Sequence, residues 1–483
     1  MATSAGGGPL SLKRVLLLLI GSHLTILFLQ LPIRQLVFDS TFWRDALLLV
    51  TLATWGAAML MRPGRFRLSG LDALVLAMVG YGTLLTLIGS LTDGNAADQL
   101  LDFRNYFLPW LIYFPARLAF AVPRHRLTYV RYLMVFFVVF LASPALEWLY
   151  SLSNLPMEWI PWYSYTFSHD NRFLGNSDSA YIDPANSPIL GLLGYPHYTA
   201  PVLVALFAFL IPLLSYRLPV PAGGREKALT AFSRLPQGVY TLLLGIVVVM
   251  LRVRTQIVTA LVVLFVVPSG GRALKFGLYA AAAVGATILW FPEQAMEVGQ
   301  SFAAGVVRSD GNASSLDLIL SVREVLFVAS SPIKQLLFGH GPGFDAAASG
   351  QWELRLLYFT ARLGVVWVLL FGGVVAGVFR GILRIRETYA KSALEFRVAQ
   401  GVFGMTAVYL LDSGHYMRLM TWPNLDLWII SISLISAVLD DSAGRWEIAP
   451  VQPGGSPGPA LACYAGAKVS GHVEPMLNSS LTH

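Results

Sequence analysis

The amino-acid sequence predicts an all-α polytopic membrane protein with about 12 transmembrane helices. Apolar residues make up 55% of the 483 positions and charged residues only 13%, whereas a typical soluble domain carries about 25% charged residues. The apolar residues fall in blocks of roughly 20, the length of helix that crosses about 30 Å of hydrocarbon. The segments between the blocks are too short or too polar to form a core of their own. We therefore expect a single transmembrane domain in residues 1–440.

The first apolar block follows Lys13 and Arg14 and resembles a signal peptide. Because no small-residue cleavage site comes after it, we expect an uncleaved first span. The predicted spans are 12–31, 44–61, 71–91, 101–122, 129–150, 198–216, 236–252, 254–269, 273–291, 354–379, 398–412 and 424–440. The eighth span is short and begins at Arg254, so the boundaries within 236–269 are the least defined.

The distribution of cations predicts the orientation of these spans. Lysine and arginine collect in alternate loops, such as 62–67 and 380–397, while the loop 91–100 contains Asp93 and Asp98 but no cation. Because cation-rich loops remain in the cytoplasm, we place them and both termini on that side. Two long segments, 151–197 and 292–353, then lie outside, the second between the ninth and tenth spans. The net charge of +7 follows from this topology, so we expect no nucleic-acid partner.

Residues 441–483 are rich in Gly, Pro, Ser and Ala, and such a composition predicts a disordered cytoplasmic tail. The single cysteine, Cys463, excludes an intrachain disulfide. The sequence has no zinc-ligand spacing, phosphate-binding glycine loop or dinucleotide fingerprint. Asp93, Asp98 and Asp102 do not form a tight Asp-x-Asp pair, so we expect no metal and no cofactor.

Arginines on the outer side of the bilayer are the most informative feature, because a charge held at this depth costs a few kcal/mol. A guanidinium fork binds phosphate or pyrophosphate through two parallel hydrogen bonds. Alternatively, each arginine snorkels to the interface or pairs with an acid such as Glu147, Glu324 or Asp412. The candidate arginines are Arg104 in the fourth span, Arg252 and Arg254 at the end of the seventh, Arg172 and Arg323 in the long outer segments, Arg362 in the tenth span, and Arg418.

Three side chains are candidates for proton transfer. Glu353 begins the helix that enters the tenth span, where partial desolvation would make it a usable base; it is equally well explained as a helix-start carboxylate. His340 lies in a glycine-rich turn, Gly339–Phe344, and His197 in a second one, Gly191–Ala200. Either histidine can instead have a structural role.

Four segments, in this order along the chain, carry a likeness to a known family. They are Gly191 to Ala200; Arg254-Thr255 at a span end; Arg323-Glu324 followed by the turn Gly339-His340-Gly341-Pro342-Gly343-Phe344; and Glu353 to Gly364. In these segments the chain resembles the O-antigen polymerase (Wzy) and O-antigen ligase superfamily of membrane glycosyltransferases. Three departures stand out: Val253 replaces a common serine, His197 replaces an asparagine, and Ser187-Pro188 stand where an arginine is usual.

The resemblance implies a GT-C-like fold in the bacterial inner membrane and an inverting, metal-independent transfer at the periplasmic face. Undecaprenyl-pyrophosphate-linked glycans would be donor and acceptor, membrane lipid would surround the site, and a chain-length regulator is a candidate partner. Arg254 with Arg172 or Arg323 would hold the pyrophosphate, and Glu353 would accept the proton.

Because ligases carry a His-Asn pair where this chain has Glu353-Leu354, the resemblance favours a polymerase, with a ligase as the alternative. A polysaccharide or lipid transporter is an alternative of another class. The sequence shows no inverted repeat and no matched pair of broken helices, which argues against transport.

Overall fold

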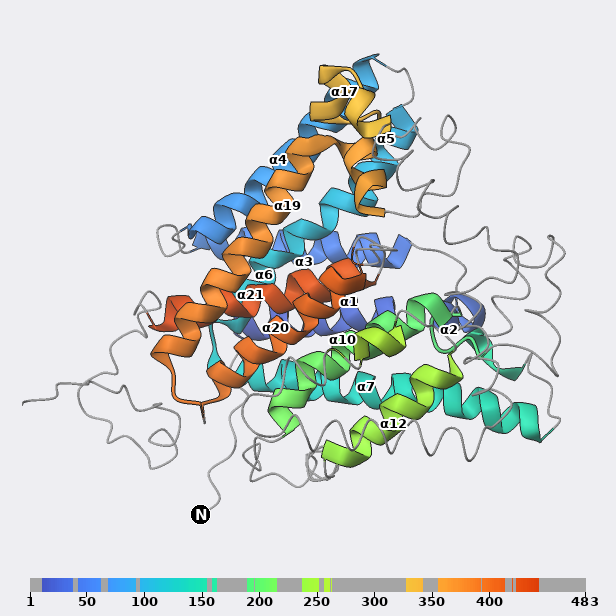
Figure 1. Cartoon of the computed structure of the whole chain (residues 1–483). Coiled ribbons are helices and arrows are strands. Elements are labelled where there is room, and N and C mark those ends of the chain that lie inside the picture. The colour runs from blue at the N-terminus through green and yellow to red at the C-terminus, as the bar shows by residue number, and fades with distance from the viewer. Residues whose placement is uncertain are drawn as a thin grey trace, which may run out of the picture.

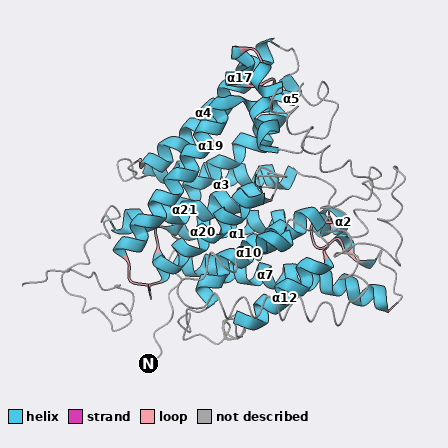
Figure 2. Cartoon of the chain, in the orientation of Figure 1, coloured by secondary structure: helices cyan, strands magenta, loops and turns pink. Residues whose placement is uncertain are grey.

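The computed structural model describes residues 11–37, 42–61, 68–92, 96–153, 159–162, 189–194, 196–214, 237–251, 256–260, 262, 327–341, 355–391, 393–412, 419 and 423–442. About 90% of these residues are helical and none of them forms a strand. The expected all-α class is therefore confirmed, and Figure 2 shows the helices joined by turns and loops. The tail 441–483 lies almost wholly outside the described residues.

Each predicted span except the ninth, which lies outside the described residues, contains described helix, although of the eighth span only 256–260 and 262 are described. The fourth span is divided between two α-helices, a π-helical turn and a 3-10 turn. In chain order the elements are α1 (Leu12–Phe28), α2 (Gln30–Leu36), α3 (Phe42–Met61), α4 (Gly70–Thr92), α5 (Ala96–Asp102), π-helical η1 (Phe103–Phe107), 3-10 helical η2 (Leu108–Ile112), α6 (Tyr113–Phe120), α7 (Pro123–Leu152), α10 (Pro196–Leu214), α12 (Gln237–Met250), α17 (Ile333–Phe338), α19 (Arg355–Thr388), α20 (Leu394–Asp412) and α21 (Asn424–Ser442).

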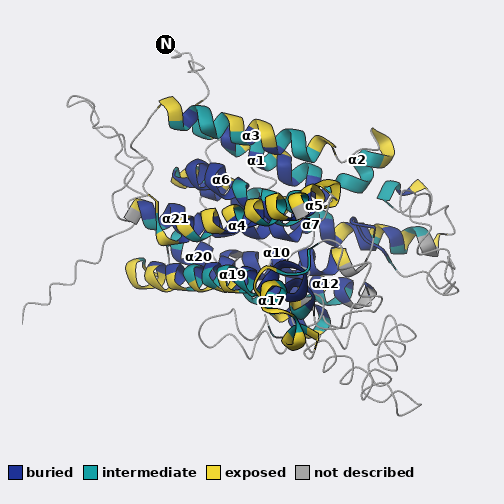
Figure 3. Ribbon diagram, turned by 90° about the horizontal axis from the view of Figure 1, so that it is seen from above, coloured by how far each residue is buried: buried dark blue, intermediate teal, exposed yellow. Residues whose placement is uncertain are grey.

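Several of these helices are suited to a bilayer. Phe42–Met61, Gly70–Leu91, Pro123–Tyr150 and Leu356–Thr388 are each long and apolar enough to cross a membrane, and α1 and α2 together make a fifth if their 76° bend lies within one span. Exposed residues run along α3 and α4 (Figure 3), including Leu60 and Leu91, which are 84% and 86% exposed. Such apolar surface is what lipid tails cover. The count of 12 spans and the outer loops remain predictions.

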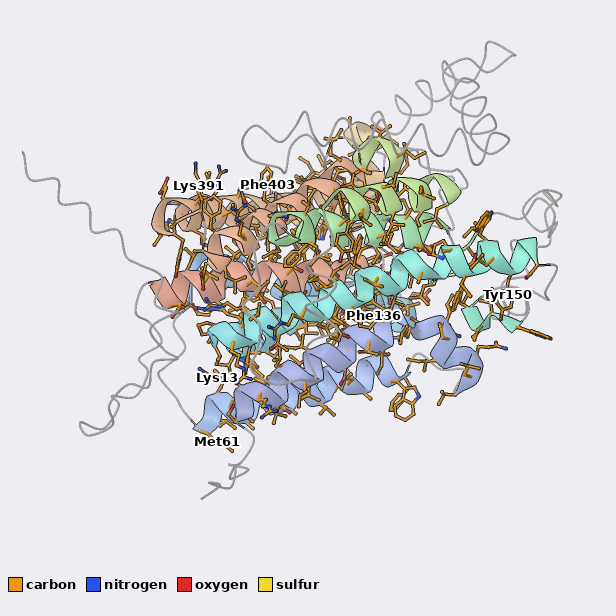
Figure 4. The ribbon with its side chains drawn as sticks, turned by 90° about the horizontal axis from the view of Figure 1, so that it is seen from below. Lys13, Met61, Phe136, Tyr150, Lys391 and Phe403 are labelled. Atoms are coloured by element: carbon orange, nitrogen blue, oxygen red, sulfur yellow. The ribbon has the colours of Figure 1, made fainter. Side chains whose placement is uncertain are left out.

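Most of the helices lie side by side in one bundle (Figure 1), while α4 and α19 pack on each other and lean away toward the end that carries α5 and α17. Figure 4 shows Lys13, Met61 and Lys391 at one end of the bundle and Tyr150 at the other. The alternation of cation-rich loops predicts this arrangement of the four residues. Which end faces the cytoplasm remains a prediction.

Helix α21 lies at the centre of the polar contacts within the bundle. Its side chains pair with three earlier helices, and nearly all of these partners are buried. The pairs are His23–Asp426 at 2.9 Å, Tyr129–Ser431 at 3.0 Å, Tyr113–Ser436 at 2.6 Å, Arg117–Asp440 at 2.6 Å and Arg126–Asp441 at 3.3 Å. A buried polar group is tolerated only when it is bonded, so these pairs fix how α21 sits against α1, α6 and α7.

Arg117 is the most extensively paired of these groups. It is 1% exposed and lies between Asp440 of α21 and Asp72 of α4, with which it forms ion pairs. The hydroxyl of Tyr113 donates to Asp72 Oδ1 at 2.9 Å. One guanidinium therefore holds two buried carboxylates and ties three helices together.

Candidate functional site

Helix α19 is interrupted at Gly364, which has φ 85° and ψ 165°. A carbonyl in a continuous helix accepts a bond from the amide four residues later, and the break disturbs that pattern for the carbonyls just before it. Here, the backbone N–H of His340 donates to Ala361 O at 2.8 Å and that of Gly341 to Arg362 O at 3.1 Å. The hydroxyl of Tyr81 on α4 donates to Leu363 O at 2.5 Å. The carbonyls before the break are therefore satisfied by the glycine-rich turn and by α4.

Two glycines make this contact possible. Gly339 and Gly364 both have positive φ, and a Cβ at either position would lie 2.1 Å from a backbone carbonyl oxygen, that of Arg362 or of Leu337. The predicted glycine-rich turn is confirmed in its described part, where Gly341 also has positive φ. The close backbone approach that it permits is to α19, since the amides of His340 and Gly341 are bonded there.

Arg362, just before the break, is 8% exposed and forms a fork-shaped pair with Asp102. Its Nε donates to Asp102 Oδ2 at 3.1 Å and its Nη2 to Asp102 Oδ1 at 2.7 Å. Its Nη1 donates to the hydroxyl of Tyr358. The guanidinium carbon lies 5.5 Å from the ring centre of Tyr106 and 5.8 Å from that of Tyr358, within range of cation–π attraction.

The partner carboxylate lies in the predicted fourth span, whose helix is also interrupted. Asp102 ends α5 and is followed at once by the π-helical turn η1 and the 3-10 turn η2; short π segments are frequent at functional sites. The ring of Phe107 in η1 fits against Gly82 of α4, where a Cβ would lie 2.1 Å from the ring. The sequence showed no sign of a matched pair of broken helices, but the structure has irregular backbone at Gly364 of α19 and in η1 and η2, and these two places meet at the buried Arg362–Asp102 ion pair.

Arg104 also forms an ion pair. It lies on η1, and its Nε and Nη2 contact Asp45 Oδ2 of α3 at 2.7 Å and 2.6 Å. Arg44 donates to the other oxygen of the same carboxylate at 3.1 Å. The sequence left two explanations open for each outer arginine, phosphate binding or pairing with an acid. Arg362 and Arg104 do pair with acids, but the partners are Asp102 and Asp45 and not the acids considered from the sequence.

His340 is half-buried beside the break. Its Nε2 lies 3.2 Å from Ser331 Oγ, and its ring lies 5.3 Å from that of Phe327. Burial lowers the pKa of His340, so the imidazole stays neutral to lower pH than an exposed histidine. A neutral imidazole can accept a proton, the chemistry for which this residue was singled out.

The second glycine turn is organised by Glu147 of α7, which is fully buried. One carboxylate oxygen accepts from Leu190 N at 2.6 Å, and the other accepts from Gly191 N at 2.7 Å and from the Trp162 indole. Thr199 of α10 donates to Leu190 O at 3.0 Å. Glu147 therefore anchors the turn that leads into α10, whose first turn contains His197.

We expect Glu147→Gln to destabilise this turn, because the amide nitrogen of glutamine would face backbone donors in place of an acceptor oxygen. Leaving such a buried group unsatisfied costs about 1–3 kcal/mol. The measurements are the thermal unfolding midpoint of the purified protein in detergent and the rate at which chymotrypsin, which cleaves after Leu and Tyr, cuts within residues 189–200. Glu387→Gln on the exposed end of α19 is the control and is expected to leave both unchanged. Equal behaviour of the two variants would contradict the anchoring role.

The structure brings Arg362, His340 and the turn at Gly339 together, with Arg104 on the adjoining η1. His197 belongs to α10, and its side chain is not described. The predicted site residues that lie outside the described residues are Glu353, Arg254, Arg252, Arg172 and Arg323.

The sequence reasoning missed the partners Asp102, Asp45 and Tyr81. Asp102 was considered only as a metal ligand. Opposite charges in two apolar blocks, Asp102 in one and Arg362 in another, were the signal that could have predicted this ion pair. Among the described residues, no group of three or more His, Cys, Asp or Glu side chains is placed to hold a metal ion.

Comparison with known proteins gives no relative from which a family can be read. No family model matches the chain, and no curated protein matches it.

Proposed function

We propose that this protein is an inner-membrane glycosyltransferase that joins undecaprenyl-pyrophosphate-linked repeat units into a surface polysaccharide (O-antigen, capsule or exopolysaccharide). The observation that carries the proposal is the junction of two interrupted spans. There a fork-shaped guanidinium, a half-buried histidine and a glycine turn lie together. These groups suit a phosphate-bearing, hydroxylated ligand better than an apolar one.

The proposed reaction is a single displacement. A hydroxyl oxygen of the acceptor unit attacks the anomeric carbon of the donor glycan, and the bond from that carbon to the pyrophosphate oxygen breaks. The lipid pyrophosphate leaves with the electron pair, and guanidinium groups neutralise its charge. Glu353 takes the proton of the attacking hydroxyl. The pyrophosphate ester supplies the driving force, so no nucleotide is consumed.

The test is to express Arg254→Ala and Glu353→Gln in a strain that lacks the chromosomal copy, and to separate the lipid-linked glycans by size. We expect both variants to remain in the membrane and to yield only single repeat units. Arg384→Ala, an exposed arginine near the opposite end of α19, is the control and should give full-length polymer. Normal chain lengths from either site variant would remove that residue from the reaction.

Ligation of finished polymer to lipid A core remains the alternative within the same chemistry. Loss of the linked product, with polymer still accumulating on undecaprenyl pyrophosphate, would favour it.

A transporter is favoured by one specific observation, because transporters bind substrate where interrupted helices meet near a buried charge. Proteoliposomes that move radiolabelled lipid-linked glycan across the bilayer without changing its length would support transport over transfer.

A further inference from the structure

We infer that the fork of Arg362 is a phosphate-binding site and that Asp102 is the exchangeable anion that fills it when no ligand is bound. The inference deepens the proposed function, because it names a residue pair for recognition of the diphosphate. Its physical basis is the geometry of this ion pair and the two elements that carry its partners.

The geometry of the pair is the one that a phosphate would reproduce. Arg362 donates two roughly parallel hydrogen bonds, from Nε and Nη2, to the two oxygens of Asp102. A carboxylate and a phosphate offer the same spacing of acceptor oxygens to this edge of a guanidinium. The site is therefore built for a two-oxygen anion, and Asp102 is one such anion supplied by the chain.

Arg362 has contacts that do not depend on Asp102. Its Nη1 bonds to the hydroxyl of Tyr358, one helical turn earlier in α19, and its face lies against the rings of Tyr358 and Tyr106. The carbonyl of Arg362 is held by Gly341 N. The guanidinium would thus keep its place if the carboxylate moved away, which is the preorganisation that a binding site requires.

Asp102, itself buried, lies on a short helix whose other residues are mostly exposed. It ends the short helix α5, which packs on α4 and η1 and whose neighbouring residues Leu100 and Leu101 are 59% and 46% exposed. The wide π-helical turn η1 follows it directly. A shift of α5 relative to α4 would withdraw the carboxylate from Arg362.

Such an exchange keeps the charge of Arg362 balanced. A buried guanidinium without a counter-ion is strongly unfavourable, so Arg362 needs an anion both before and after ligand binds. Asp102 provides it in the empty protein, and a diphosphate takes its place. Removing the charge of Asp102 should therefore strengthen diphosphate binding, whereas a purely structural ion pair would make the same change neutral or harmful.

The experiment measures diphosphate binding to the full chain in phosphatidylcholine nanodiscs, with inorganic pyrophosphate and undecaprenyl pyrophosphate as separate probes. The variants are Asp102→Asn, Arg362→Gln and the double variant, with Asp426→Asn as the control that changes another buried carboxyl group, the hydrogen-bond partner of His23, in the same way. We expect Asp102→Asn to be less stable than the parent but still folded, and to bind at least about tenfold more tightly. The double variant and Arg362→Gln should lose that gain, and Asp426→Asn should not show it.

If Asp102→Asn binds both probes more tightly, the diphosphate alone is recognised. If it binds only undecaprenyl pyrophosphate more tightly, the site takes a diphosphate that is attached to a lipid. Unchanged or weaker binding by folded Asp102→Asn would overturn the exchange. So would failure of Asp102→Asn to fold, because the tyrosine contacts would then be insufficient to hold Arg362. Glycan extension is measured in a separate assay. If the exchange is seen but the protein does not extend glycans, the polymerase proposal is rejected and the diphosphate site stands. If the protein extends glycans but shows no exchange, only the role of Asp102 is rejected.

Discussion

Gly364→Ala is expected to abolish accumulation of folded protein. The backbone at this position has φ 85° and ψ 165°, a region essentially restricted to glycine that costs other residues on the order of 1–3 kcal/mol. The added Cβ would also lie 2.1 Å from Leu337 O, and such overpacking typically costs a further 1–3 kcal/mol or so. Because the clashing atom is backbone, no side-chain rotation relieves it. The measurement is the yield and thermal unfolding midpoint of the variant in detergent.

Gly372→Ala is the matched control, since it lies on the same helix with nothing within 4 Å of the added Cβ. Alanine is the better helix former by about 1 kcal/mol, so this variant should be at least as stable as the parent. If Gly364→Ala accumulated and unfolded like Gly372→Ala, α19 would not be interrupted in the way described.

Arg117→Gln should produce the largest loss of stability of any single charge change in the bundle. Asp72 and Asp440, 0% and 2% exposed, would then be left without their common cation. Removing one partner of a buried ion pair typically costs about 3–5 kcal/mol. The free energy of unfolding in mixed detergent micelles is the quantity to compare with that of the parent protein.

Arg124→Gln is the control for this change, because Arg124 is exposed at the start of α7 and exposed charges contribute at most about 1 kcal/mol. Neutralising the acids as well, in Asp72→Asn with Arg117→Gln and Asp440→Asn, should restore much of the loss, because no charge is then buried alone. A triple variant no more stable than Arg117→Gln would show that the charge balance is not what holds these helices.

The sequence was sufficient to predict the helices and the glycine turns, because both depend on local composition. A block of about 20 apolar residues identifies a span wherever its partners lie, and glycine at 339 and 341 predicts backbone that other residues avoid. The turn at Gly191 was predicted for the same reason.

The break inside α19 was not predicted, because the apolar run continues through Gly364 and hydropathy contains no information on φ. The ion pairs were missed for a different reason. Asp102 and Arg362 are separated by 260 positions, and only the three-dimensional packing decides that this acid, and not Glu147, faces the arginine. Glu147 is instead occupied by backbone amides, a role that no charge pattern indicates.

The pairing of α21 with earlier helices has a consequence for biogenesis. His23, Arg117 and Arg126 are synthesised long before Asp426, Asp440 and Asp441, so on emerging from the ribosome the earlier helices carry ionisable groups that still lack their partners on α21. Until α21 arrives, these groups must stay near water or at the translocon. We therefore expect the nascent chain to reach a protease-resistant state only after residue 442 has been released, and assembly factors that shelter polar transmembrane segments to be engaged until then.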